Sequence, residues 1–173
     1  MDYPQPGALE NEAKAKINKS QSTIIANLKN RKNMREINKI IIMNSGAEYG
    51  NANKIRYEDI ERGYRTIGCH YVICNGHVYR GDEYEANVKD GAVEQGRAVQ
   101  MAGSHTRGHN IDSIGIMLIG KRDFTNMQMA SLAKLVNELC EKYGVDKSNV
   151  YEQNQLDKNY KKLNITDINK IIN

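Results

Sequence analysis

The chain has 173 residues, which suits one domain with one appendage, and 39% of its residues are hydrophobic, which is enough for a core. A formal net charge of +4 arises from 25 basic and 21 acidic residues. No dense block of Lys or Arg indicates nucleic-acid binding, although residues 29–32 form a small basic cluster. No apolar run is long enough to cross a membrane.

The three cysteines, Cys69, Cys74 and Cys140, stand at unrelated spacings. They form neither a disulfide framework nor a paired-cysteine metal site, so free thiols in a reducing compartment are expected. The first residues lack a charged segment followed by an apolar one, which argues against a secretory signal. A cytoplasmic location is therefore expected.

Residues 1–36 are expected to form an appendage and residues 37–173 the main domain. After a start that contains two prolines and a glycine, residues 8–30 lack both residue types and repeat apolar residues at helical spacing. This spacing predicts an amphipathic helix. The helix either packs on the domain's own surface or, because its apolar stripe is narrow, serves as an arm for self-association or for a protein partner.

The first half of the main domain is expected to contain a strand, a helix and a second strand, at residues 37–43, 54–65 and 66–74. Asn75-Gly76 comes next, and both residue types accept the positive φ of a two-residue hairpin turn. Residues 77–80 should therefore form the return strand. Residues 81–96 are polar and acidic, so a surface excursion is expected there.

The second half is organised around residues 103–120. The part up to Asp112 is polar and punctuated by glycine, which indicates a loop, and the run from Ser113 to Ile119 is apolar, which indicates a buried strand. Binding groups concentrate on loops that a rigid strand holds in place. The two histidines, the arginine and the asparagine of this loop are therefore candidate functional residues.

A long helix is expected from Thr125 to Tyr143, because Thr125 and Gln128 match a capping box and Gly144 suits the position after the last turn. A short strand is expected over residues 149–153, and Thr166 could cap a terminal turn. Strands that alternate with helices indicate an α/β domain with one central sheet.

Three segments, in order, resemble the zinc-dependent N-acetylmuramoyl-L-alanine amidases of the type shared by phage lysozyme-amidases and peptidoglycan recognition proteins. They are residues 40–45 (IIIMNS), 67–80 (IGCHYVICNGHVYR) and 103–120 (GSHTRGHNIDSIGIMLIG). The resemblance covers about residues 37–155. It implies a mixed β-sheet flanked by helices, with a shallow substrate groove and a zinc ion at its floor.

The resemblance also implies a reaction. Such enzymes cleave the amide between the muramoyl lactyl group and L-alanine, and zinc polarises the carbonyl and activates a water, which needs three protein ligands and one open position. In the family pattern one histidine ends the first strand, and a second histidine and a cysteine or aspartate follow the long helix. A tyrosine immediately before a histidine in the second segment assists catalysis.

The sequence departs from this pattern at every ligand position. Met43 stands where the first histidine belongs, and a thioether is a poor zinc ligand. Tyr151 and Asn159 are expected at the two late positions, because no histidine follows His109 and no cysteine follows Cys140. We therefore predict that the zinc centre is absent, with no other cofactor implied and no catalytic residue assigned.

Cys69 replaces the assisting tyrosine. By strand alternation it should share a face with Tyr71 and lie in the groove beside Met43, with His70 in the core beside a hydrogen-bond partner. A relocated metal site would need a loop histidine to reach Cys69, and no spacing matches a known ligand set. Cys69 would act as a nucleophile only if a neighbouring base lowered its pKa, whereas a buried, inert thiol is more common.

The polar loop before the apolar strand remains available for binding. Arg107 can clamp a carboxylate or phosphate, and Asn110 can bond a ligand amide or cap its own loop. The residues predicted to contact a ligand in the former groove are His105, Arg107, Asn110, Asn44, Cys69 and Tyr151.

These features favour a catalytically inactive protein with the amidase fold, of phage or mobile-element origin, that binds a muropeptide or another anionic small molecule. One alternative is a structural or protein-interaction module, such as a phage-particle component or an inhibitor of a host protein, with residues 8–30 as the working surface. Another is an active amidase with a rearranged site. The host cytoplasm or the phage particle is the expected location.

Overall fold

The computed structural model describes residues 14–21, 35–85, 89–163 and 170. The chain divides into two units, Met1–Met34 and Arg35–Asn173. In the first unit, residues 14–21 are helical with exposed side chains. The rest of the helix predicted over residues 8–30, and the terminal turn predicted at Thr166, lie outside the described residues.

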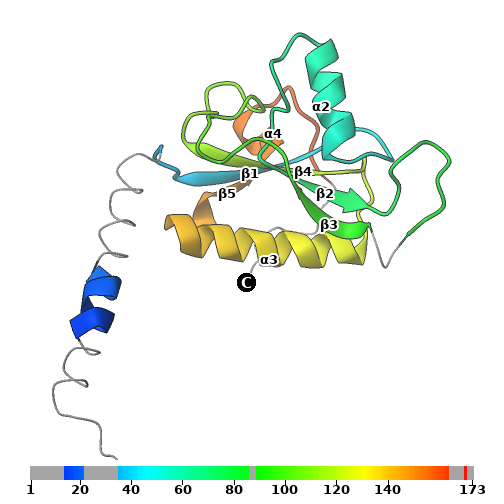
Figure 1. Ribbon diagram of the computed structural model, residues 1–173. Coiled ribbons are helices and arrows are strands. Elements are labelled where there is room, and N and C mark those ends of the chain that lie inside the picture. Colours follow the sequence, from blue (N-terminus) through cyan, green and yellow to red (C-terminus); the bar gives the residue numbers. More distant parts are fainter. Residues whose placement is uncertain (1–13, 22–34, 86–88, 164–169, 171–173) are drawn as a thin grey trace, which may run out of the picture. The chain divides into compact units, whose positions relative to one another are not determined.

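The second unit is built on a five-stranded mixed sheet with the order β3-β2-β4-β1-β5. Strands β1, β2, β4 and β5 run parallel, and β3 pairs with β2 in the antiparallel sense (Figure 1). The predicted α/β fold with one mixed central sheet is confirmed. The strands are β1 Lys39–Asn44, β2 Tyr71–Asn75, β3 Asp90–Gln95, β4 Ser113–Leu118 and β5 Val150–Glu152.

Helices cover both faces of this sheet. Because side chains alternate along a strand, Ile40 and Ile42 of β1 belong to one buried cluster and Ile41 and Met43 to another. The long helix α3 (Asn126–Tyr143) packs on the first face, and α2 (Ala52–Glu61) contributes to the second (Figure 1). A single turn, α4 (Gln153–Leu156), follows β5.

Helix α3 begins and ends as its sequence predicts. The Thr125 hydroxyl accepts from the Gln128 backbone N–H at 3.0 Å, the Gln128 side-chain oxygen accepts from the Thr125 N–H at 3.1 Å, and Gly144 closes the helix at φ 70°. The Gln128 amide also donates to the carbonyls of Ile73 and Ile119 at 3.1 and 2.9 Å. The capping residue Gln128 therefore also fixes the helix to β2 and to the end of β4.

Replacing Thr125 by alanine is expected to destabilise the domain. The hydroxyl caps α3 and also donates to the buried carboxylate of Asp90 at 2.6 Å, at the start of β3. Loss of a helix cap costs about 1 kcal/mol, and the lost bond to a charged acceptor adds to it, so we expect a decrease of roughly 2 kcal/mol in the unfolding free energy. Urea denaturation measures this. Thr125→Ser keeps both bonds and should stay close to wild type; equal stability of Thr125→Ala and wild type would contradict the assignment.

The hairpin predicted at Asn75-Gly76 is wrong in its return strand. Gly76 has the expected positive φ of 84°, but residues 77–80 form no strand, and β3 at Asp90–Gln95 pairs with β2 instead. Residues 79–82 form a separate turn, in which the Tyr79 N–H donates to the Asp82 carboxylate at 2.8 Å and the Asp82 N–H donates to the Tyr79 carbonyl at 3.3 Å. The region predicted as a surface excursion therefore supplies an edge strand of the sheet.

Candidate functional site

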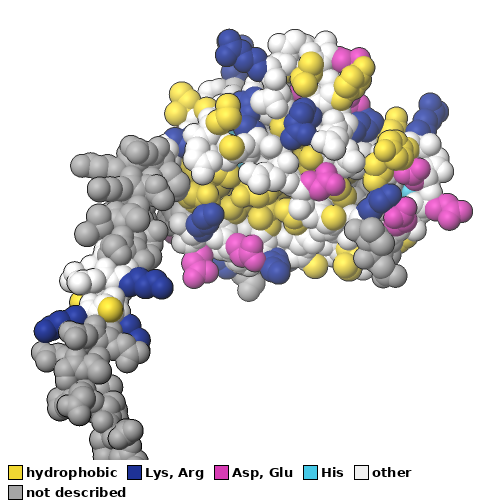
Figure 2. All heavy atoms as spheres, viewed as in Figure 1, with side chains coloured by type: hydrophobic (Ala, Val, Ile, Leu, Met, Phe, Trp, Pro, Cys, Tyr) yellow, Lys and Arg dark blue, Asp and Glu magenta, His cyan; other side chains and the backbone are white. Residues whose placement is uncertain are grey.

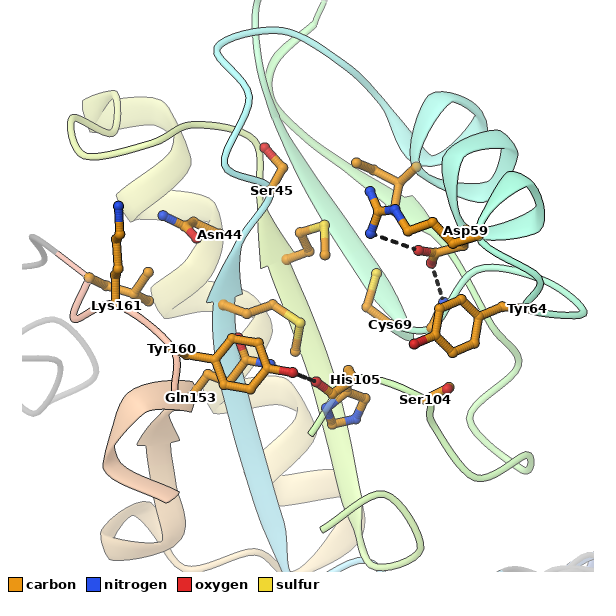
Figure 3. Close-up of a pocket in the computed structure, with 16 residues that line it drawn as sticks. Asn44, Ser45, Asp59, Tyr64, Cys69, Ser104, His105, Gln153, Tyr160 and Lys161 are labelled. Atoms are coloured by element: carbon orange, nitrogen blue, oxygen red, sulfur yellow. Dashed lines mark hydrogen bonds and ion pairs between the residues drawn. The ribbon is translucent and has the colours of Figure 1, made fainter. Parts of the chain in front are cut away.

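A cavity of about 210 Å³ opens on the α2 side of the sheet (Figure 3). Its walls come from the end of β1, from α2, from the loop before β4 and from residues 157–163, which we call the C-terminal strap. Its lining residues are Met43, Asn44, Ser45, Ile55, Asp59, Arg62, Tyr64, Gly68, Cys69, Ser104, His105, Met117, Gln153, Tyr160, Lys161 and Leu163.

The buried part of this pocket contains sulfur side chains. Met43 and Cys69 both line it, as predicted, and both are almost fully buried. The prediction that Cys69 shares a face with Tyr71 is wrong, since Tyr71 packs against the cluster on the other face. Strand β2 begins only at Tyr71, so strict alternation does not extend back to Cys69. Burial, with a smaller contribution from Asp59, raises the pKa of the Cys69 thiol to about 12, so the thiol stays protonated.

His70 is a fully buried histidine with hydrogen-bond partners, as predicted. Its Nδ1 accepts from the Gly115 N–H at 2.9 Å, which leaves the proton on Nε2 to donate to the Met101 carbonyl at 3.0 Å. The Arg35 guanidinium lies beside the ring and donates to the carbonyls of Val99, Ile111 and Ser113 at 2.8, 2.6 and 2.7 Å. Burial lowers the pKa of His70 to about 4, so the ring is neutral near pH 7.

His105 lies at the pocket between two close glycines. A Cβ added at Gly103 or Gly115 would stand 2.4 or 2.6 Å from the His105 Cδ2 atom, so only glycine leaves room for the ring. The ring meets His70 edge-on with 5.8 Å between centroids, and Nδ1 lies 3.0 Å from the Thr106 hydroxyl. Burial lowers the pKa of His105 to about 3, and its Nε2 has no hydrogen-bond partner among the described residues. His105 therefore shapes the pocket as a neutral ring.

The structure brings three of the predicted ligand-contacting residues together and separates the others. Asn44, Cys69 and His105 line one pocket. Arg107 is exposed and stands outside that lining. The Asn110 side chain accepts from the backbone N–H groups of His105 and Thr106 at 2.8 and 2.9 Å, so it caps its own loop. The Tyr151 hydroxyl lies outside the pocket as well, since it donates to Asn149 at 3.1 Å.

The two residues expected at the late positions of the family pattern, Tyr151 and Asn159, lie outside the pocket lining. Gln153 and Lys161 line the pocket instead. Gln153 and Lys161 are separated by eight residues, as Tyr151 and Asn159 are. Strand β5 ends at Glu152, and Gln153, the first residue of α4, lines the pocket. Its amide donates to the His105 carbonyl at 2.6 Å (Figure 3).

Comparison with known proteins decides the family. Residues 33–162 match the family described as N-acetylmuramoyl-L-alanine amidase. The chain belongs to this amidase family. The endolysin of Escherichia phage T7 is 35% identical over 98 residues, which are 52% of this chain and 56% of that protein. The endolysin of Enterobacteria phage T3 gives the same values. The chain thus spans about half the length of the curated relatives it matches.

Solved structures share the amidase fold. The N-acetylmuramoyl-L-alanine amidase LysC from Clostridium intestinale superposes with a TM-score of 0.65 at 23% identity, covering 80% of this chain and 84% of that one. Drosophila PGRP-LB gives a TM-score of 0.56 at 19% identity over 71% and 72% of the two chains. A complex of the peptidoglycan recognition proteins LCa and LCx, solved with tracheal cytotoxin bound, gives 0.55 at 23% identity over 70% and 73%.

The pocket of this amidase-family chain does not fit the three-ligand zinc centre that the resemblance implies. All four histidines and all three cysteines of the sequence lie at described positions, and only Cys69 and His105 of these line the pocket. Within the described ranges, no group of three His, Cys, Asp or Glu side chains is arranged to hold a metal ion. A thioether, an amide and an ammonium, from Met43, Gln153 and Lys161, are poor or impossible zinc ligands.

Charged groups stand on two walls of the pocket. Asp59 accepts from the Gly68 N–H at 2.9 Å and pairs with Arg62 at 3.6 Å. Lys161, on the C-terminal strap, has no carboxylate partner in the part of the chain that the structure describes. The pocket therefore offers one unneutralised ammonium group to a ligand. None of the helices in that same part has the length and apolar character needed to cross a membrane.

Proposed function

We propose that this chain is a catalytically inactive member of the amidase family that binds a peptidoglycan fragment in the pocket beside β1. The observation that carries the proposal is the set of side chains at Met43, Gln153 and Lys161. Met43 is the next-to-last residue of β1, where the family pattern has its first zinc ligand, and the other two follow the long helix, as the remaining ligands of the pattern do. A thioether, an amide and an ammonium are poor or impossible zinc ligands, which supports binding without a metal.

The groups that could replace metal-activated water do not support hydrolysis. A general base must be unprotonated and basic near its working pH, but the low pKa of His105 makes it a weak base, and its Nδ1 is occupied by Thr106. The Cys69 thiol, with its pKa near 12, is not a nucleophile at neutral pH. The residues present favour binding without cleavage.

The ligand class follows from the charge and shape of the pocket. Lys161 presents an ammonium that pairs with no carboxylate of the described residues, and Asn44 and Tyr160 add polar groups near it (Figure 3). A carboxylate-bearing peptide stem fits such a pocket, because charge-assisted bonds to carboxylates are the strong ones. Support also comes from the peptidoglycan recognition proteins LCa and LCx, which share the fold and were solved with tracheal cytotoxin. A role in the host cytoplasm or in a phage particle agrees with the phage endolysin relatives.

Calorimetric titration with a muramoyl tripeptide tests this function. Wild type is expected to bind. Lys161→Glu should bind at least about tenfold more weakly, since it replaces the ammonium by a carboxylate that repels the carboxylates of the ligand. Lys158→Glu is the matched control, because Lys158 belongs to the same strap but lies outside the pocket lining. Mass spectrometry should detect no cleaved peptide.

Two results would overturn the proposal in different ways. Stoichiometric zinc in the purified protein, together with released peptide, would show an active amidase with a rearranged site. Absence of binding to any muropeptide, together with partner capture that deletion of residues 1–33 abolishes, would show a protein-interaction module.

A further inference from the structure

A second cavity, of about 590 Å³, lies at the carboxyl end of β1 and beyond β2. Strands β1 and β4 are neighbours, but the chain leaves β1 for α2 on one face and β4 for α3 on the other. In sheets of this kind, ligands bind in the crevice that such a divergence opens outside the carboxyl ends of the strands. Its lining residues are Gly46, Ala47, Glu48, Tyr49, His77, Tyr79, Arg80, Gly81, Asp82 and Lys121.

Two walls of this cavity are joined by hydrogen bonds. The Gly50 N–H donates to the His77 carbonyl at 2.8 Å, and the Asn75 amide donates to the Glu48 carbonyl at 2.8 Å. These two bonds join the loop after β1 to the loop after β2. These bonds hold two walls of the cavity together, and small-molecule sites are usually pre-formed in this way.

An exposed aromatic ring stands on one wall. Tyr79 is 69% exposed, yet its backbone is held in a tight turn by the Asp82 carboxylate at 2.8 Å. A tyrosine ring presents a flat apolar face and a polar hydroxyl. This combination suits a sugar ring, which has apolar C–H faces and hydroxyl edges. A second tyrosine, Tyr49, stands among the lining residues, with the Lys54 ammonium 4.8 Å above its ring.

The charges of the cavity balance. Two acids, Glu48 and Asp82, face two bases, Arg80 and Lys121, and Lys121 lies 3.4 Å from Glu48. Figure 2 shows acidic, basic and apolar side chains mixed over the loop that follows β2, at the right of the view. A balanced set of charged hydrogen-bonding groups favours a neutral ligand with many hydroxyls over an anion. This distinguishes the second cavity from the pocket that contains Lys161.

We propose that this second cavity is an oligosaccharide-binding site in which Tyr79 stacks on a sugar ring. Asn44 and Ser45 line the first pocket and the next residue, Gly46, lines the second cavity, so the two sites adjoin along the chain. A polymer made of glycan and peptide could occupy both. The proposal stands independently of the function proposed for the first pocket, because a glycan without peptide should bind here alone.

An NMR titration with the tetramer of N-acetylglucosamine, which carries no peptide, tests the site. Wild type should show saturable shifts at residues 46–49 and 77–82. Tyr79→Ala should weaken binding about tenfold or more through loss of stacking, and Tyr79→Phe, which keeps the ring, should bind within about twofold of wild type. Tyr57→Ala is the matched control, since Tyr57 is an equally exposed tyrosine outside both cavities.

The first pocket is separated from this test by its own variant. Lys161→Glu should leave binding of the tetramer unchanged while it weakens binding of the muramoyl tripeptide. No saturable binding of the tetramer to wild type, or equal binding by a folded Tyr79→Ala protein, would overturn the glycan site. Either result would leave the proposal for the first pocket to be judged by the tripeptide alone.

Discussion

Replacing Met43 and Gln153 by histidine and Lys161 by cysteine is expected to create a chain that binds one zinc ion per molecule. All three positions line one pocket and come from the end of β1, the start of α4 and the C-terminal strap. Two imidazoles and a thiolate form a three-ligand set that leaves a coordination position open. Elemental analysis measures the metal, and bound zinc should raise the thermal midpoint in proportion to its binding free energy.

The control for this triple variant is a second triple variant, Met43→Leu with Gln153→Asn and Lys161→Ser, whose side chains are not zinc ligands. It should contain no zinc. Gln153→His removes the amide that donates to the His105 carbonyl, but a ring N–H of the new histidine could donate there instead. If the triple variant folds and still contains no more zinc than the control, then these three residues do not occupy the ligand positions of the family.

Lowering the pH from about 6.5 to about 4 is expected to reduce the unfolding free energy by several kcal/mol, because each of the two buried histidines contributes about 3 kcal/mol. The pKa of His70 is lowered to about 4 and that of His105 to about 3, chiefly by burial. Between these values and the ordinary histidine pKa of about 6.5, the unfolded chain binds more protons than the folded one. The contribution of the two neutral histidines to the unfolding free energy is therefore fully present above the ordinary histidine pKa, and it is lost as the pH falls toward the lowered pKa values of the folded state.

Urea denaturation at several pH values between about 4 and about 7 checks this expectation. His70→Asn keeps a side-chain acceptor near the Gly115 N–H but removes the titrating group, so it should reduce the pH slope by about one proton. Glu152 has the opposite effect on the unfolding free energy over part of this pH range, since burial raises its pKa. His109→Asn serves as the control. A slope in His70→Asn equal to that of wild type would show that His70 does not titrate on unfolding.

Local sequence signals predicted the fold well where they acted within one element. Thr125, Gln128 and Gly144 set the limits of α3 through bonds between residues at most a few positions apart. The hairpin failed because Asn75-Gly76 specifies a turn but not the partner strand. Here Asp82 closes a separate turn, and the partner strand begins at Asp90, whose carboxylate is bound by Thr125 from a distant segment.

The candidate site was predicted less completely, because its members depend on where strands end. Asn44, Cys69 and His105 follow from the family resemblance of three segments, but Gln153 and Lys161 depend on the length of β5 and on the turn of α4. Arg107 was expected to reach the groove, yet the bonds from His105 and Thr106 to Asn110 fold the loop so that Arg107 lies exposed. The role of Arg35 had no sequence signal, since it depends on three carbonyls that are distant in the sequence.

The two faces of the sheet pack into different buried clusters, and the pocket lies on the α2 face. The larger cluster, formed with α3, contributes Leu163 to the pocket lining, whereas Met43 and Cys69 belong to the cluster on the α2 side. Substitutions at Met43 or Cys69 therefore change the packing of the smaller cluster. A fold arranged in this way tolerates substitutions at its binding face while the larger cluster keeps its packing. It therefore offers a scaffold on which side chains with new chemistry can be selected in the pocket.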